Sequence, residues 1–192
     1  MVYDSETITA NGLNVRVTYH YDEDASAPWE DCDGVGQVRK SNAAHSEYRS
    51  DKKPGERPLS QAGCNEFQFY YDWQAAMATA KAEGWNAEPY SAPNKAARAV
   101  QADFDYMRGY VRQDWQFVWI DAVVLDDDGQ PVGEVDSLSG VETYKDYHSE
   151  QAQAMANEVT QRYLQDLEDA RQAAHIAARY QDAQNLGIVE TQ

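Results

Sequence analysis

Carboxylates are the side chains of this sequence that are most able to take part in chemistry. Asp121 is the one acid inside an apolar run from Trp115 to Leu125, and strand alternation places it on the same face as Trp119. A carboxyl group buried there would hold its proton tightly and could serve a hydrolase as a general acid or base. An aspartate at a bulge or on a solvent-facing segment, paired with an arginine, explains the same position without catalysis, and we expect that structural role.

Other signatures of catalysis or cofactor binding are absent from the sequence, which has no P-loop, GxSxG or HExxH motif. Gly34-Val35-Gly36 lacks the third glycine and the strand-to-helix setting of a dinucleotide site. Asp126 to Gly129 lacks an oxygen ligand where Val124 stands, so a hairpin turn is favoured over a calcium loop. We therefore expect no cofactor, no metal and, on balance, no enzyme.

The two cysteines do not indicate a disulfide framework or a metal site. Cys32 and Cys64 form no CxxC pair, which favours two free thiols over a disulfide. A zinc site that combines them with His20 and His45 has none of the usual ligand spacing.

Acidic clusters are the most informative feature. The chain of 192 residues has 33 acidic and 16 basic side chains, for a net charge of −17. Rows of carboxylates can imitate the phosphates of a DNA duplex for a protein that grips DNA, although acidic clusters also serve simply as solvated surface. The acidic partner-binding residues that we predict are Asp22, Glu23, Asp24, Glu30, Asp31, Asp33, Asp126, Asp127, Asp128, Glu150, Glu158 and Glu168.

One segment of the chain is basic, in contrast to the acidic remainder. The stretch from Arg39 to Arg57 has six basic and three acidic residues and so carries +3, while the remainder carries −20. It offers a basic contact loop for nucleic acid, or a segment that folds over the protein's own acidic surface. Self-association or solvation is favoured over nucleic-acid binding, because Tyr48 is its one aromatic residue. The basic residues are Arg39, Lys40, Arg49, Lys52, Lys53 and Arg57.

The elements that must position these groups begin with a β-hairpin. Residues 7–10 and 13–19 flank Asn11-Gly12, a pair typical of a type I′ turn. Residues 22–65 have little hydrophobic period and predict a long polar loop with one or two short strands at most. A strand at 66–71 then leads through Asp72, as a helix cap, into a helix from Trp73 to Glu83.

Three further elements follow. The spacing of Val100, Phe104 and Met107 predicts a helix that begins near residue 93. The run from 115 to 125 is apolar on both faces, which is typical of a strand inside a sheet, and 131–135 returns antiparallel to it. Residues 149–184 contain no proline or glycine and predict a helix about 54 Å long, with an alanine-rich stripe that suits close packing, either in the protein's own core or against a dimer partner.

These elements predict an α+β fold, in which an antiparallel sheet of four to five strands is packed by two helices and followed by a long C-terminal helix. We expect an α+β domain at 1–145 with the polar loop at about 22–65, and the helix and tail at 146–192. No window has the ~20 apolar residues of a membrane span, and the start lacks a signal-peptide pattern, so we expect a cytoplasmic protein with no membrane contact.

Several stretches, taken in order, resemble a group of small acidic proteins encoded by tailed bacteriophages and prophages. The resemblance spans roughly residues 15–143 and rests on Val17–Asp24, Ala27–Glu30, Asp33–Gly34, Lys53–Arg57, Phe69–Asp72, Glu83–Trp85, Ala97–Phe104 and Val124–Glu134. The group carries no assigned activity, so the resemblance implies a context, a viral accessory protein in the bacterial host cell, and no site residue.

Charge and resemblance together predict a non-enzymatic phage accessory protein. Its acidic surface would bind a host or phage protein with a cationic surface, as a DNA mimic that inhibits a restriction or CRISPR-type defence enzyme. Direct contact with nucleic acid is not expected at this net charge. The alternatives are an assembly protein that forms a homodimer through the C-terminal helix, and a hydrolase that uses Asp121.

Overall fold

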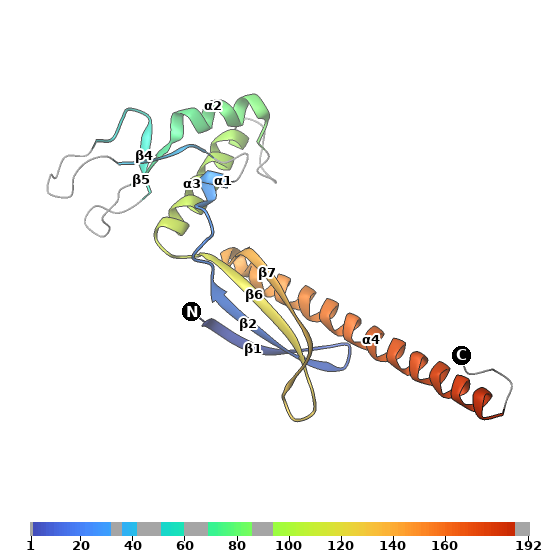
Figure 1. Cartoon of the computed structure of the whole chain (residues 1–192). Helices are drawn as coiled ribbons and strands as arrows, with labels where there is room; N and C mark the ends of the chain where they lie inside the picture. Colours follow the sequence, from blue (N-terminus) through green and yellow to red (C-terminus); the bar gives the residue numbers. More distant parts are fainter. Residues whose placement is uncertain (1, 32–35, 42–50, 60–68, 86–93, 187–192) are drawn as a thin grey trace. The chain divides into compact units, whose positions relative to one another are not determined.

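The chain forms two compact units, which the computed structural model describes at residues 2–31, 36–41, 51–59, 69–85 and 94–186 (Figure 1). Unit 1 combines residues 1–23 with 117–192, and unit 2 comprises residues 24–116. Unit 1 is therefore built from both ends of the chain, and unit 2 is an insertion between two of its strands.

Unit 1 is a four-stranded antiparallel sheet with one long helix. Its strands are β1 (Val2–Ala10), β2 (Leu13–Tyr21), β6 (Phe117–Leu125) and β7 (Pro131–Glu142), in the spatial order β1-β2-β6-β7. A short 3-10 turn, η2 (Tyr144–Asp146), leads into α4 (Tyr147–Asn185). Neighbouring strands of the sheet are consecutive within the unit, but β2 and β6 are separated in sequence by the whole of unit 2.

The first hairpin forms as its turn residues predict. Asn11 and Gly12 have φ angles of 50° and 82°, the positive values that a type I′ turn needs at both central positions, and Ala10 pairs with Leu13. The side chain of Asn11 also fastens the turn to the helix, because its Nδ2 donates to Thr160 Oγ1 at 2.8 Å. This bond fixes the end of the hairpin against α4.

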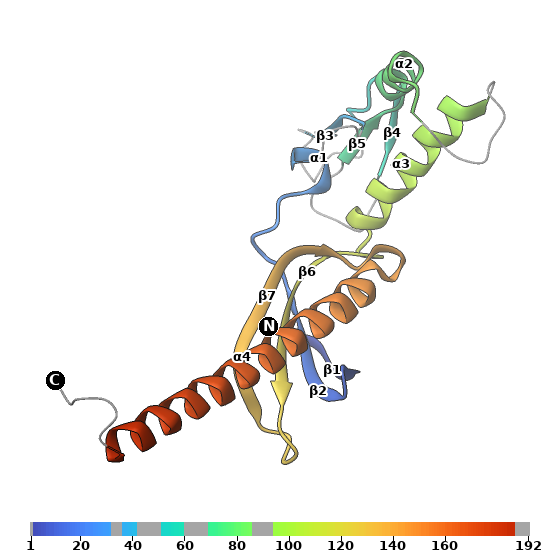
Figure 2. The same ribbon diagram turned by 90° about the vertical axis from the view of Figure 1, so that its right-hand side faces the viewer.

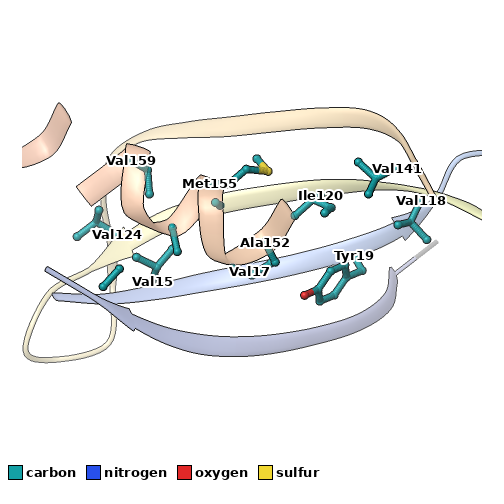
Figure 3. Close-up of a cluster of buried hydrophobic side chains, with 13 residues drawn as sticks. Val15, Val17, Tyr19, Val118, Ile120, Val124, Val141, Ala152, Met155 and Val159 are labelled. Atoms are coloured by element: carbon teal, nitrogen blue, oxygen red, sulfur yellow. The ribbon is translucent and has the colours of Figure 1, made fainter. Parts of the chain in front are cut away.

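The core of unit 1 lies between one face of the sheet and the first half of α4 (Figure 3). Alternate residues of the central strands point to this face, including Val15, Val17 and Ile120, and each is fully buried. Ala152 and Met155 pack on them from α4. Each valine or isoleucine buried in this way stabilises the fold by about 1.5–3 kcal/mol, so this layer holds the two ends of the chain together.

The second half of α4 runs past the sheet (Figure 2). Residues 164–182 are all exposed, and among them Leu164, Ile176 and Tyr180 expose 41%, 67% and 53% of their surface. The stripe that packs on the sheet is thus continued by residues that no described part of the chain covers.

Unit 2 has a smaller sheet with two helices. Strands β3 (Val38–Lys40), β5 (Phe69–Asp72) and β4 (Glu56–Pro58) lie in that order, all antiparallel, after a single helical turn α1 (Pro28–Asp31). Helices α2 (Trp73–Glu83) and α3 (Lys95–Val111) complete the unit. The core residues of this unit are Leu59, Tyr71, Ala76, Ala80, Val100, Phe104 and Met107.

The bounds of α2 follow from its end residues. Asp72 accepts a hydrogen bond from the Ala75 N–H at 2.9 Å, which is an N-cap, and Gly84 adopts the left-handed conformation that ends a helix. Both boundaries are those that the sequence predicts.

The α+β class, the four-stranded antiparallel sheet and the long C-terminal helix are confirmed. The division of the chain differs from the expected boundary at residue 145, because α4 packs on β2 and β6 and so belongs to unit 1. The two shorter helices pack in unit 2, where segments 38–40 and 56–58 of the expected polar loop form strands. Among the described helices, none is both long and apolar enough to cross a membrane.

Candidate functional site

Asp121 lies on the face of the unit 1 sheet opposite α4. It alternates along β6 with the buried residues Ile120 and Ala122, and its side chain is 31% exposed. Its two neighbours come from the adjacent strands: His20 Nε2 of β2 lies 3.1 Å from Asp121 Oδ2, and Ser137 of β7 donates its hydroxyl to Asp121 Oδ1. Trp119 packs edge-on against His20, with 5.1 Å between ring centroids.

Serine, histidine and aspartate are the three residue types of a serine-hydrolase triad, but here their side chains are arranged in a different spatial order. In such an enzyme the imidazole lies between serine and carboxylate and removes the proton of the serine. Here the carboxylate lies between the other two: Ser137 donates its hydroxyl to one oxygen of Asp121, and His20 contacts the other oxygen. The geometry is that of a cross-strand polar cluster, which agrees with a structural role for Asp121, with histidine in place of the expected arginine.

The sequence did not associate His20 or Ser137 with Asp121. Strand alternation was the available signal, because Val17 and Tyr19 face the core and His20 must then face the other way. What the sequence lacked was the pairing of β2 with β6, in which His20 stands opposite Trp119 and Thr18 opposite Asp121.

The acidic cluster at residues 126–128 forms the β6–β7 turn. Asp126 has a structural role, because its Oδ1 accepts hydrogen bonds from the backbone N–H groups of Asp128 and Gln130 at 3.0 and 2.8 Å. Asp127 and Asp128 are exposed. Two carboxylates of this cluster are therefore presented to solvent on a turn that the third one holds.

The cluster at residues 22–24 lies at the other end of the sheet. Asp22 follows β2 and accepts a hydrogen bond from the Gly140 N–H of β7 at 2.9 Å, while Glu23 and Asp24 are exposed. Tyr21 pairs with Val118, seven residues before Leu125, so Asp22 and Glu23 are separated from the cluster at 126–128 by about 23 Å of strand. Asp24 begins unit 2.

The remaining predicted acids divide between α4 and unit 2. Glu150, Glu158 and Glu168 are exposed on α4, away from its buried side, and extend over about 27 Å of helix. Glu30 is exposed on α1. Asp31 ends α1, with its side chain outside the described residues, as is all of Asp33.

The distribution of charge between the units is more uneven than any single cluster shows. Unit 1 contains 19 acidic and 5 basic residues, for a net charge of −14, whereas unit 2 contains 14 acidic and 11 basic residues, for −3. One of the five basic residues, Arg162, is already committed to Asp136 through two hydrogen bonds of 2.6 and 2.7 Å. Nearly all of the net charge thus belongs to the unit formed by the chain ends.

The described part of the basic segment, residues 39–41 and 51–57, belongs to unit 2. Arg39 donates to both carboxylate oxygens of Glu56, each at 2.9 Å, and to Asp51 at 3.0 Å. The guanidinium of Arg57 stacks on Trp73, with Cζ 3.2 Å from the ring centroid. Arg39 and Arg57 therefore stabilise unit 2 itself.

The other predicted members of the basic segment have less definite roles. Lys53 contributes its backbone N–H to Glu56 at 2.6 Å, and Lys40 and Lys52 are also among the described residues. Arg49 lies outside them.

Unit 2 contains a half-buried acid that the sequence did not single out. Asp103 of α3 accepts hydrogen bonds from the Tyr71 hydroxyl and from the Gly36 N–H, the latter at 2.7 Å. Burial raises the pKa of Asp103, and the two hydrogen bonds oppose that rise. Burial and the hydrogen bond with Asp103 raise the pKa of Tyr71 above its ordinary value, so the tyrosine hydroxyl keeps its proton.

Asp103 lines neither of two depressions on the described surface. One, of about 170 Å³, lies in unit 2 beside Gly36, Thr79 and Trp85. The other, of about 420 Å³, is lined by α4 residues such as Glu168, His175 and Ile176 and has no opposing wall among the described residues. No group of three or more metal-ligating side chains converges anywhere in the described ranges, and Cys32, Cys64 and His45 fall outside them.

Comparison with known proteins adds no relative: no protein-family model matches the chain, and neither a curated protein nor a solved structure shows significant similarity to it. The functional argument therefore rests on the charge and geometry of the chain itself.

Proposed function

We propose that the protein binds a cationic protein surface through unit 1 and has no catalytic role of its own. The observation that carries this proposal is the net charge of −14 on unit 1, against −3 on unit 2. Surplus charge of one sign attracts an oppositely charged partner over a distance of about one Debye length, ~8 Å at physiological salt, and speeds the encounter.

The shape of the charged surface supports a DNA-binding enzyme as the partner. Exposed carboxylates lie at both ends of the sheet, about 23 Å apart, and along about 27 Å of α4. At 3.4 Å per base pair, these lengths correspond to roughly seven to eight base pairs of duplex. A surface of this extent imitates the phosphates that a restriction or CRISPR-type nuclease contacts, and the protein then acts as a DNA-mimic inhibitor.

The biological setting forms part of the same proposal. The resemblance of residues 15–143 to small acidic proteins of tailed phages supports an accessory protein that works in the bacterial cytoplasm. An inhibitor of host defence fits that setting, because it requires a charged surface and no catalytic residue.

Affinity capture from a bacterial lysate, with the full chain as bait, tests this function. We expect a DNA-binding enzyme that elutes between low and high salt and is displaced by duplex DNA. Capture of no such protein, or of one that duplex DNA does not displace, contradicts DNA mimicry.

A charge variant separates the acidic surface from the rest of the chain. Asp127→Asn with Asp128→Asn and Glu23→Gln removes three exposed charges and leaves the turn-forming Asp126 intact. We expect at least a tenfold loss of affinity for the captured enzyme at low salt and a weaker salt dependence. The matched control changes three exposed acids of unit 2, Glu30→Gln, Asp105→Asn and Asp114→Asn, and should retain binding; equal losses in both variants contradict a site on unit 1.

A further inference from the structure

Strand β1 forms one edge of the unit 1 sheet, and β2 is its one neighbour among the described strands (Figure 1). It has nine residues, and from Asp4 to Ala10 its pairing with β2 shows no register shift. The opposite edge, β7, begins at Pro131, has positive φ angles at Gly133 and Gly140 and shifts register twice against β6. Irregularities of this kind protect an edge from further pairing. Among the described strands, β1 therefore offers the longest regular edge.

The outward backbone groups of this edge belong to alternate residues. Asp22, directly after β2, donates its N–H to the Phe117 carbonyl at 3.1 Å, so the even-numbered residues of β2 direct their backbone groups toward β6. The odd-numbered residues of β2 face β1, where their partners are even-numbered. The N–H and C=O groups of Ser5, Thr7 and Thr9 therefore point away from the sheet, toward a side on which no described strand pairs with them.

The side chains of β1 determine which charge an added strand should carry. Asp4 and Glu6 are exposed, lie on the same face of the strand as Ile8, and have no basic residue beside them in β1. A second copy of this chain would bring another unit of net charge −14 to the edge, which opposes self-pairing. A strand with lysine or arginine opposite Asp4 and Glu6 gains two cross-strand ion pairs instead.

We propose that β1 is the docking edge for an extended basic segment of the cationic partner, which adds a fifth strand to the four-stranded sheet of unit 1. The backbone groups of Thr7 and Thr9 supply the main-chain hydrogen bonds. In antiparallel alignment, the segment that fits reads Thr-Val-Thr-Lys-Thr-Lys-Thr, with valine opposite Ile8 and the lysines opposite Glu6 and Asp4. This inference rests on the proposed binding of a cationic protein by unit 1, and adds how that protein attaches.

A peptide of this sequence, acetylated and amidated at its ends, tests the edge in an NMR titration of the isotope-labelled full chain. We expect the amide signals of Thr7 and Thr9 to shift with a dissociation constant of about 0.1–1 mM, and their hydrogen exchange to slow. The control peptide Thr-Val-Pro-Lys-Pro-Lys-Thr keeps both lysines and lacks N–H groups that would face β1. No shift at Thr7 and Thr9 up to about 5 mM peptide, or equal shifts with both peptides, overturns the proposal.

A backbone variant tests the same edge from the side of the protein. Thr7→Pro removes the outward N–H and breaks no hydrogen bond with β2, whereas Thr7→Val keeps the N–H and the branched side chain. We expect roughly tenfold weaker peptide binding for Thr7→Pro and unchanged binding for Thr7→Val. Equal binding by the two variants overturns the proposal. If Thr7→Pro lowers the urea midpoint, the comparison of the two peptides on the wild-type chain decides between the outcomes.

The contribution of charge is tested by two variants that each remove one carboxylate. Glu6→Gln removes a charge from β1 and can still accept the hydrogen bond of the Tyr19 hydroxyl. Asp127→Asn removes an exposed charge from the β6–β7 turn. We expect peptide binding to weaken several-fold for Glu6→Gln and to change little for Asp127→Asn. Equal losses overturn the placement of the peptide at β1.

Capture of the enzyme from the lysate separates this inference from the proposed function. Loss of capture with Thr7→Pro, but not with Thr7→Val, supports strand addition. Capture that Thr7→Pro leaves intact overturns strand addition and retains the proposed function. Peptide pairing at Thr7 and Thr9 without capture of any DNA-binding enzyme supports the docking edge and contradicts DNA mimicry.

Discussion

Replacement of Glu56 by glutamine tests how the basic segment is held. The Glu56 side chain is 7% exposed and accepts both hydrogen bonds of Arg39, at 2.9 Å each, as well as the Lys53 N–H at 2.6 Å. The hydrogen bond from Arg39 lowers the pKa of Glu56, which shows that the pair favours the ionised carboxylate. Glu56→Gln keeps the shape of the side chain and removes that charge.

The expected cost follows from the surroundings of Arg39. Breaking a buried ion pair costs about 3–5 kcal/mol, because one charge is left without a partner. Arg39 is 28% exposed and retains Asp51 at 3.0 Å, so the loss should fall below that range, at about 2–3 kcal/mol. With a urea m-value of about 1.5 kcal/mol per molar, the unfolding midpoint of unit 2 should decrease by about 1–2 M.

The acid dependence gives a second readout. Because the pKa of Glu56 is lower in the folded chain than in the unfolded chain, the stabilisation is complete above the unfolded value of about 4.3 and is lost as pH falls below it. Stability of the wild-type unit should therefore decrease below about pH 4.3. Glu56→Gln removes this carboxyl group and should flatten that decrease.

Tryptophan fluorescence in urea is a suitable assay, since unit 2 contains Trp29, Trp73, Trp85 and Trp115 and unit 1 contains only Trp119. Glu30→Gln, which removes an exposed acid from the same unit, is the control. A midpoint for Glu56→Gln equal to that of the control, or an unchanged acid limb, would refute the reasoning.

Two further predictions concern packing. Gly36→Ala places a methyl group against the Tyr71 ring and should destabilise unit 2 by about 1–3 kcal/mol, a loss that tryptophan fluorescence in urea will measure; a midpoint equal to wild type would show that the ring can move aside. Met155→Ala removes a core side chain of unit 1 that is 8% exposed and should cost about 2–4 kcal/mol in urea unfolding followed by circular dichroism, with the exposed Gln153→Ala as control; equal midpoints would contradict the packing of α4 on the sheet.

Local elements follow from short-range physical chemistry, and the sequence predicts them well. Asn11-Gly12 can adopt the two positive φ angles of a tight hairpin, and Asp72 and Gly84 satisfy the backbone groups at the ends of α2. The apolar run of β6 requires strands on both sides, which β2 and β7 provide. Each of these preferences acts within a few residues, so the order of the chain is sufficient to find it.

Pairing between strands that are far apart in sequence could not be predicted in this way. Tyr21 and Val118 are paired in the sheet although the whole of unit 2 lies between them in sequence, and nothing local to either strand specifies that partner. The split of the expected single domain into two units follows from this pairing. One or two short strands were expected in this part of the chain, but their positions at 38–40 and 56–58 were not, because each has three residues and gains its stability from β5 between them.

The sequence alone determined the net charge, the run of β6 and the length and stripe of α4. Tertiary structure decided that most of the charge belongs to one unit, since both acidic ends of the chain fold into unit 1 and the segment between them in sequence is nearly neutral. It also decided the chemistry of Asp121, whose neighbours His20 and Ser137 come from strands on either side. The physical reason is common to both: a sheet brings together residues that are far apart in the chain, and side-chain surroundings depend on that proximity.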